Sequence, residues 1–190
     1  TGRDLETLTR GINALTHWTG KSCATIVFDS QTDQFFSEDI FPKVKEKMNI
    51  AIVCFTSDGD VFGGFYSRAV KTEWKEIYDK NIFAFSFESN GRCMVPQRFV
   101  LKESEIARVE FLIATPYHES GVVIFSVSNK ACFELGSRNN TYCWNLSAAF
   151  DGLEDTTLTG KNCGLRRSGC SVITYGPYSY CRRLLAIQLS

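Results

Sequence analysis

Cysteine is the residue type whose number and chemistry stand out in this chain. Eight of the 190 residues are cysteines, Cys23, Cys54, Cys93, Cys132, Cys143, Cys163, Cys170 and Cys181. An even number would allow every cysteine to form a disulfide bond in a secreted protein. However, 44% of the residues are hydrophobic, so the chain can build a core without covalent cross-links. We therefore expect reduced thiols in an intracellular protein, located in the cytoplasm with the nucleus as an alternative.

Two of the cysteines have cationic neighbours that would favour a reactive thiolate. Cys181 precedes Arg182 and Arg183, and Cys163 follows Lys161 by two residues. Nearby positive charge lowers the pKa of a thiol, and the thiolate is the nucleophilic form. Together with a resolving cysteine, such a thiolate could reduce peroxides. A cysteine-based peroxide scavenger is therefore one alternative, which we rank below a role without catalysis.

The other residues with catalytic or metal-binding chemistry do not form a recognised set. The sequence contains no Cys-x-x-Cys pair, and neither His17 nor His118 has a second histidine or a close cysteine at ligand spacing. The acidic segment that begins at Asp29 fails as an EF-hand because Gln34 occupies the position that requires glycine. No serine lies in a Gly-x-Ser-x-Gly elbow. We expect no metal, no cofactor and no catalytic residue, which favours a protein that is not an enzyme.

Two glycosylation patterns support an alternative of a different class. Asn139-Asn-Thr and Asn145-Leu-Ser match the acceptor sequence for glycans in secreted proteins. If the cysteines formed disulfides, the chain could be a secreted sugar-binding sandwich. Asn140, Tyr142 and Trp144 would then contact the glycan.

The balance of charges argues against a global attraction to nucleic acid or to an anionic membrane. Lysine and arginine total 21, as do aspartate and glutamate. The only local basic segment contains Lys161, Arg166, Arg167, Arg182 and Arg183. A transcription regulator that binds DNA through this segment is a further alternative, but its charges are expected to be ordinary solvated residues. No apolar stretch approaches the roughly 18 residues of a membrane span, so we expect no membrane insertion.

Two apolar segments on either side of a polar turn predict the centre of the fold. Residues 50–56 and 61–66 are rich in apolar side chains, and Ser57, Asp58, Gly59 and Asp60 between them suit a tight hairpin turn. Gly63 and Gly64 would weaken the second strand unless a bulge or a close backbone approach requires the missing side chains. We predict a β-hairpin in which Asp58, Gly59, Gly63 and Gly64 have structural roles.

Two helices are expected before this hairpin. Apolar residues at steps of three and four predict a helix over residues 4–18, capped by Thr1 or Asp4. It could pack on the sheet or end an upstream coiled coil through which the protein would oligomerise. A second helix is predicted within residues 35–48, beginning near Glu38 because Pro42 is tolerated in a first turn.

Short apolar segments separated by turn residues predict the remaining strands. They cover residues 23–30, 82–88, 92–101, 109–115, 122–127, 131–135, 142–146 and 184–189. Asn90-Gly91 is a further hairpin signal. Regularly spaced short strands after two helices predict an α+β fold. We expect a two-sheet antiparallel β-sandwich with peripheral helices that are mainly N-terminal.

The order of these motifs resembles the TLDc domain family, the domain of oxidation-resistance proteins. The resemblance covers residues 17–190 and leaves residues 1–16 as a leader helix or the end of a coiled coil. It rests on Ile26-Val-Phe-Asp-Ser, Asp58-Gly-Asp-Val-Phe-Gly-Gly-Phe and Phe83-Ala-Phe-Ser-Phe, in that order. The chain also looks like the divergent, cysteine-bearing members of this family in amoeboid protists.

The second half of the chain departs from the family pattern. A segment from Gly136 to Cys143 stands where the family has a glycine-rich stretch, and Ala186-Ile-Gln stands where the last strand commonly carries glutamate and tryptophan. The resemblance implies a β-sandwich with peripheral helices, protection against oxidative stress and, for some relatives, binding to the proton-pumping vacuolar ATPase. It brings no catalytic mechanism. We therefore predict a non-catalytic TLDc interaction domain of an intracellular protein, with a protein partner.

Overall fold

The computed structural model describes ten segments of the chain. These are residues 2–33, 37–72, 77–90, 92–110, 121–127, 131–136, 140–144, 146–154, 156–158 and 179–190. Of residues 37–39, 106–110, 121–127, 131–136 and 140–144, only the backbone is described. Among all described residues, no helix is long and apolar enough to cross a membrane.

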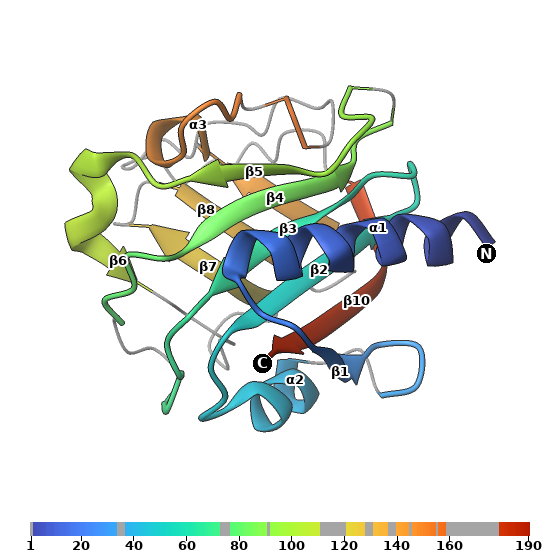
Figure 1. Cartoon of the computed structure of the whole chain (residues 1–190), viewed down its shortest axis with the longest axis horizontal. Coiled ribbons are helices and arrows are strands. Elements are labelled where there is room, and N and C mark those ends of the chain that lie inside the picture. Colours follow the sequence, from blue (N-terminus) through green and yellow to red (C-terminus); the bar gives the residue numbers. More distant parts are fainter. Residues whose placement is uncertain are drawn as a thin grey trace.

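The fold is α+β, with few helices and antiparallel strands (Figure 1). The helices are α1 (Gly2–Thr19), α2 (Ser37–Val44), the 3-10 helix η1 (Glu103–Arg108) and α3 (Leu146–Ala149). The strands are β1 (Ala24–Asp29), β2 (Ile50–Thr56), β3 (Val61–Tyr66), β4 (Phe83–Glu88), β5 (Gln97–Val100), β6 (Val109–Glu110), β7 (Gly121–Val127), β8 (Ala131–Gly136), β9 (Asn140–Trp144) and β10 (Ser179–Leu189). The α+β class and the N-terminal position of the two longer helices were predicted and are confirmed.

Six strands form the main antiparallel sheet, in the order β5-β4-β3-β2-β10-β1. The strand that comes last in the chain, β10, therefore lies inside this sheet, between β2 and β1. The first two residues of β10, Ser179 and Tyr180, pair instead with β9. From β9 the pairing continues through β8 and β7 to β6 as an antiparallel meander. This main sheet carries hydrophobic side chains on both faces.

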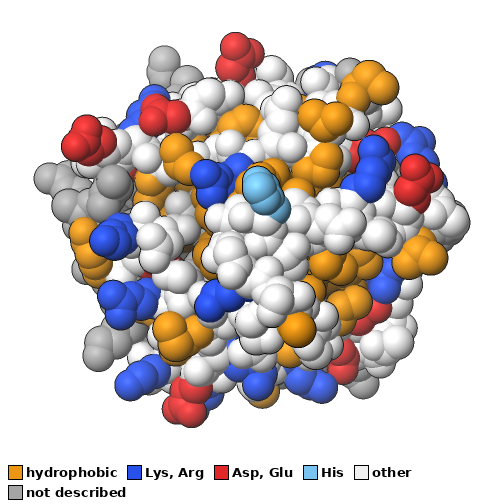
Figure 2. Space-filling model, viewed as in Figure 1, with side chains coloured by type: hydrophobic (Ala, Val, Ile, Leu, Met, Phe, Trp, Pro, Cys, Tyr) orange, Lys and Arg blue, Asp and Glu red, His pale blue; other side chains and the backbone are white. Residues whose placement is uncertain are grey.

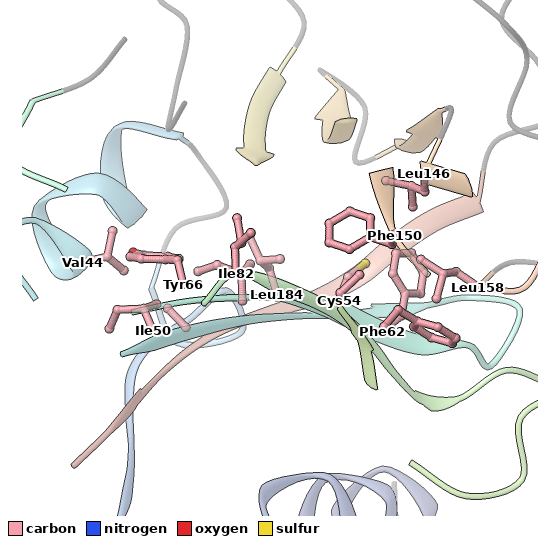
Figure 3. Packing of buried hydrophobic residues seen from close by; sticks show 14 of the residues in the cluster. Val44, Ile50, Cys54, Phe62, Tyr66, Ile82, Leu146, Phe150, Leu158 and Leu184 are labelled. Carbon is pink, nitrogen blue, oxygen red and sulfur yellow. The ribbon is translucent and has the colours of Figure 1, made fainter. Parts of the chain in front are cut away.

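Both faces of the main sheet are covered, which explains the continuous apolar sequence of its central strands. Every residue of β2 and β3 is buried. The face beneath α1 contains a cluster that includes Phe55, Phe65 and Phe85. The opposite face contains Cys54, Phe62 and Leu184 together with residues from α2, α3 and the segment after α3 (Figure 3). A short apolar run without alternation is typical of a strand buried on both sides.

Helix α1 lies across the front of strands β2 to β4 (Figure 1). Its buried side chains include Leu8 and Leu15, so the apolar stripe predicted from the sequence faces the sheet. Gly11 also lies on this face, and a Cβ atom there would overlap the ring of Phe87. A glycine in the middle of a helix costs roughly 1 kcal/mol relative to alanine, and here it allows the helix to approach the sheet closely.

The predicted hairpin forms the centre of the main sheet. Strands β2 and β3 pair from Ile50 with Tyr66 to Phe55 with Val61, and Gly59 has a φ of +92° in the turn. A Cβ atom at Gly63 would overlap the carbonyl oxygen of Ile52 on the neighbouring strand. The pairing of β3 with β4 also shifts register between Val61 and Phe62. The close backbone approach that the two glycines suggested is therefore present at Gly63.

Several element boundaries differ from the prediction. Residues 92–101 were expected to form one strand, but β5 contains only Gln97–Val100. The shorter strand has two causes, because Cys93 pairs back to Ser89 and Pro96 has no N–H to donate. Helix α2 begins at Ser37, close to the predicted start, and ends at Val44 rather than Met48. The positive φ of Glu46, 61°, shows that the helical conformation is lost there.

Strand β10 is longer than predicted, since it starts at Ser179 rather than Leu184. In the predicted strand over 109–115, the structure describes Val109 and Glu110 as β6, and residues 111–115 lie outside the described part. The predicted strands over 122–127 and 131–135 correspond to β7 and β8. The predicted strand over 142–146 is displaced, because β9 covers Asn140–Trp144 and Leu146 begins the short helix α3, which was not predicted.

Candidate functional site

A β-bulge in β10 brings together two arginines that are consecutive in the sequence. Opposite β2, Cys181 pairs with Thr56 and Arg183 pairs with Phe55, so Arg182 is an additional residue in the strand. A bulge places two residues of one strand opposite one residue of its neighbour. The guanidinium carbons of Arg182 and Arg183 consequently lie 5.6 and 5.8 Å from the centre of the Phe55 ring.

Arg182 joins β10 to the first turn of α1. Its two terminal nitrogens donate hydrogen bonds to the carboxylate oxygens of Asp4, at 2.8 and 2.5 Å, and its Nε donates to the Thr56 carbonyl at 3.0 Å. The hydrogen bond to Asp4 raises the pKa of Arg182. Asp4 was predicted as a helix cap, but it lies inside α1, which begins at Gly2, and is only 8% exposed. It therefore acts as the carboxylate partner of a residue 178 positions away.

Arg183 makes the equivalent connection to the end of β1. Its Nε and one terminal nitrogen donate to the two carboxylate oxygens of Asp29, at 3.1 and 2.5 Å. Burial opposes ionisation of Asp29, but hydrogen bonds from Arg183 and from the N–H of Gln31 prevail and lower its pKa. Two consecutive arginines therefore bind carboxylates from two different N-terminal elements. We call Arg182, Arg183, Asp4 and Asp29 the arginine clamp.

A second ionic group fastens α1 to β4. The Glu88 carboxylate accepts hydrogen bonds from Arg3 and from the Thr7 hydroxyl, and it lies 3.7 Å from Arg10. Burial would raise the pKa of Glu88, whereas the hydrogen bonds from Arg3 and Thr7 and the nearby positive charges lower it. Side chains from the first three turns of α1 thus converge on one carboxylate at the end of β4.

The acidic residues of the hairpin turn also have structural partners. The Ser179 hydroxyl donates to Asp58 at 3.2 Å, and the N–H of Ser57 donates to the Tyr180 carbonyl at 2.8 Å. Asp60 is buried and accepts a hydrogen bond from Arg92 at 2.8 Å. The hairpin turn is thereby connected to the start of β10 and to the turn after β4. Gly59 lies in this turn, whereas Gly63 and Gly64 lie in β3, away from it.

The candidate redox residue Cys181 lies in the core, with an exposed fraction of 2%. It belongs to the cluster on the α2 side of the sheet, whereas Arg182 and Arg183 contact Phe55 on the α1 side. The thiol donates a hydrogen bond to the Arg183 carbonyl at 3.2 Å. The cationic neighbours that drew attention to this cysteine are therefore bound to carboxylates on the other face. Cys163 and Lys161 lie outside the described residues.

Four of the eight cysteines have described side chains, and all four are thiols. Cys54, Cys93 and Cys181 are buried, and Cys23 is exposed. The side chains of Cys132 and Cys143 and the whole of Cys170 belong to the part of the chain that the structure does not describe. Within the described part, no group of three or more histidine, cysteine or acidic side chains could hold a metal ion.

The remaining sequence candidates are distributed as follows. Of the basic segment, Arg182 and Arg183 are paired in the clamp, and Lys161, Arg166 and Arg167 are not among the described residues. His17 is exposed on α1, and His118 is not described. The backbone of β9 contains Asn140, Tyr142 and Trp144, but their side chains are not described.

The arginine clamp was not predicted from the sequence, although a signal for it exists. Two consecutive charged residues in an otherwise apolar strand conflict with the alternation of faces, and a bulge resolves that conflict. Their partners Asp4 and Asp29 had been considered only as a helix cap and as part of a failed calcium loop. Chemically, the clamp holds elements together through charge-assisted hydrogen bonds.

No protein-family model matches the chain, and no curated protein is significantly similar to it.

Proposed function

We propose that this chain is a non-catalytic protein-interaction domain of the TLDc type. In this proposal it is a two-sheet β-sandwich with peripheral helices, and it belongs to an intracellular protein of the oxidative-stress response. Its partner is another protein, for which the resemblance suggests the vacuolar ATPase.

The observation that carries the proposal is the placement of the three motifs of the resemblance. The Phe28 strand, the hairpin around Gly59 and the Phe83–Phe87 strand are distant in sequence, yet β1, β2, β3 and β4 belong to one sheet. The terminal apolar strand β10 lies between β1 and β2. Motifs that recur in order along a family are expected to build one common core, and these residues do so here.

The strands β6 to β9 support the second layer of the proposed sandwich. The meander leaves the main sheet where β9 pairs with the start of β10. In Figures 1 and 3 strands β7 and β8 lie on the side of the main sheet opposite α1. Phe150, Leu146 and Leu158, from α3 and the segment after it, belong to the hydrophobic cluster on that side. We infer that β6 to β9 form the second sheet over this cluster.

The use of the charged side chains supports binding rather than catalysis. Asp4, Asp29, Asp60 and Glu88 all accept hydrogen bonds from arginines that fasten one element to another. A general base or nucleophile must instead reach a substrate. On the face that carries α1, acidic and basic side chains are scattered among apolar ones rather than gathered into a patch of one sign (Figure 2). The buried Cys181 is poorly placed to meet a peroxide, which argues against the scavenger alternative at that residue.

The first experiment determines the state of the cysteines in protein isolated from its native source. Thiols are blocked during isolation, and the intact mass is measured after denaturation without reductant. We expect all eight cysteines to carry the blocking group, as an intracellular domain requires. Disulfide-linked cysteines in every position would contradict the proposal and support the secreted sugar-binding alternative.

The second experiment tests partner binding directly. The purified domain is immobilised and exposed to purified vacuolar ATPase, before and after treatment of the domain with peroxide. We expect saturable binding, and no peroxide consumption above that of a Cys163→Ser, Cys181→Ser double variant. Catalytic peroxide turnover that the double variant loses would replace the proposal by the scavenger alternative. Failure to bind this one partner, with thiols intact, would exclude the ATPase and leave a search for other proteins.

A further inference from the structure

Strand β1 forms an outer edge of the main sheet, because β10 is its only strand neighbour among the described residues. The backbone groups on the other side of an edge strand can template pairing with another chain. Which residues present those groups follows from the pairing with β10. Cys23 and Ser190 exchange two backbone hydrogen bonds, so the N–H and C=O of Cys23 face β10.

Backbone hydrogen-bonding groups alternate in direction along β1, and those of Ala24 and Ile26 point outward from the sheet. Ala24 lies opposite Leu189, whose N–H donates to Asn49 on the β2 side of β10. Successive residues of a strand point their N–H and C=O groups to alternate sides. The backbone N–H and C=O of Thr25 therefore face β10, and those of Ala24 and Ile26 face away from it. Among the described residues, no backbone hydrogen bond to Ala24 or Ile26 is made from that outer side.

The side chains of this edge are suited to contact with a neighbour. Ile26 is 44% exposed, Thr25 is exposed, and no residue from Ala24 to Phe28 is charged. The other edge of the main sheet differs. In β5, Arg98 carries a charge, Pro96 precedes the strand without an N–H, and the Val100 carbonyl accepts a hydrogen bond from Asp151. These are devices by which proteins block edge strands, and none of the three occurs in β1 before its bulge between Ile26 and Phe28. Helix α2 contacts β1.

We propose that a second copy of this chain pairs with β1, antiparallel and centred on Thr25. The outward N–H and C=O groups of Ala24 and Ile26 define this register. Ala24 of each copy would lie opposite Ile26 of the other and exchange backbone hydrogen bonds with it. Thr25 would lie opposite its own symmetry mate, and the main sheet would continue across the two-fold axis.

The side chains favour a second copy over an unrelated strand. In the proposed register, Ile26 contacts Ala24 of the other copy on the α1 face, which extends the cluster against which Ala24 already packs. On the opposite face the two Thr25 side chains form a β-branched pair, a favourable combination across strands. If two copies paired antiparallel through β5 instead, Arg98 of one copy would lie near Arg98 of the other, and like charges oppose pairing. Because the bulge limits the paired segment, we expect a reversible dimer.

Covalent trapping tests the register. In antiparallel pairing, two opposed residues that do not share hydrogen bonds have Cα atoms about 4.5 Å apart, which suits a disulfide. Thr25 occupies this position in the proposed dimer. With Cys23 replaced by Ser, the Thr25→Cys variant should form a covalent dimer under mild oxidation, and peptide mapping should place the link between the two introduced thiols. Thr9→Cys, exposed on α1, is the matched control and should not cross-link.

A pair of charge substitutions tests the surface without cross-linking. Ile26 and Val100 are equally exposed, 44% and 43%, on the two edge strands of the same sheet. Sedimentation equilibrium should show a concentration-dependent dimer for the unmodified protein. Ile26→Lys should raise the dissociation constant by about tenfold or more, and Val100→Lys should leave it unchanged. Ala24→Pro, which removes an outward N–H and no hydrogen bond to β10, should act like Ile26→Lys.

Three results would overturn the proposal. One is a protein that stays monomeric at every accessible concentration while Thr25→Cys links no faster than Thr9→Cys. Another is a dimer abolished by Leu5→Lys on α1 but retained by Ile26→Lys, which would place the contact on the helix, where Leu5 is exposed. The third is a Thr25→Cys variant that links to a different protein and never to itself. The pairing of two copies needs no other protein. Failure of the dimer proposal can therefore be distinguished from failure of the proposed partner binding.

Discussion

The centre of the main sheet and its N-terminal cover are held by different interactions. In the β2–β3 hairpin, every strand residue is buried and the backbones approach closely at Gly63. Helix α1 and strand β1 also bury apolar residues, but they are additionally joined to β4 and β10 by ion pairs with Glu88, Asp4 and Asp29. Close packing therefore stabilises the centre of the sheet, whereas ion pairs add to packing in the N-terminal cover formed by α1 and β1. Substitutions and pH should separate the two regions.

The largest effect is expected at the centre, from Gly63→Ala. The new Cβ atom would overlap the carbonyl oxygen of Ile52, and a backbone atom cannot move aside as a side-chain end can. We expect a loss of about 3 kcal/mol or more in the free energy of unfolding, or failure to fold. Urea unfolding followed by tryptophan fluorescence provides the measurement.

Gly2→Ala is the matched control for this substitution. No atom lies within 4 Å of a Cβ built at Gly2, so the change should stay within about 0.5 kcal/mol. If Gly63→Ala were as stable as Gly2→Ala, close packing would not be what distinguishes the centre from the cover.

Gly11→Ala tests the packing part of the cover. Its Cβ would overlap the buried Phe87 ring, which would have to move or push the helix outward. Overpacking of this kind typically costs about 1–3 kcal/mol, reduced here by the better helix propensity of alanine. Hydrogen exchange should locate the loss in α1 and β4. Protection lost uniformly over β2 and β3 would show that the cover and the centre unfold as one unit.

The ionic part of the cover is tested by Arg182→Ala. This change leaves the Asp4 carboxylate without its two arginine hydrogen bonds in a site where it is 8% exposed. Removing hydrogen bonds from a buried carboxylate costs about 1–3 kcal/mol, and partial exposure of Arg182 places the effect toward the lower end.

A double-mutant cycle with Asp4→Asn isolates the contribution of this pair. The two changes should be less than additive, because each removes the same interaction. Strict additivity in urea unfolding would mean that Arg182 stabilises the fold through Phe55 or Thr56 rather than through Asp4.

The smallest effect is expected from pH. The pKa values of Asp29 and Glu88 are lowered in the folded protein, so the folded state favours their ionised forms. Their contribution to stability is present above the unfolded pKa of about 4 and is lost as pH falls through the lower folded values. Stability should therefore decline below about pH 4–5 with a slope that the Asp29→Asn, Glu88→Gln double variant reduces. An unchanged slope in that variant would assign the acid sensitivity to other carboxylates.

The elements that the sequence predicted well are those with local signals. The hairpin follows from apolar segments around Ser57-Asp-Gly-Asp, and α1 follows from the spacing of residues such as Leu8 and Leu15. Both depend on neighbours within a few residues. The α+β class could be derived because each short strand has its own turn residues.

The residues that were missed depend on contacts between distant parts of the chain. Nothing near Asp4 in the sequence indicates a partner 178 residues away, and nothing near Gly11 indicates the Phe87 ring. For Cys181, adjacency to two arginines suggested a cationic environment. The bulge turned both guanidinium groups to the opposite face of the sheet, where they bind Asp4 and Asp29. Sequence neighbours in a strand are poor guides to spatial neighbours, because they point to different faces.

The inner position of β10 also has a consequence for how the protein is made. A ribosome produces β1 and β2 more than 100 residues before the strand that must lie between them. Until residues 179–189 emerge, the apolar edge of β2 lacks its native neighbour, and neither β1 nor the arginine clamp can take its final position. The main sheet must therefore close late, and the nascent chain carries an exposed strand edge of the kind that chaperones protect from aggregation.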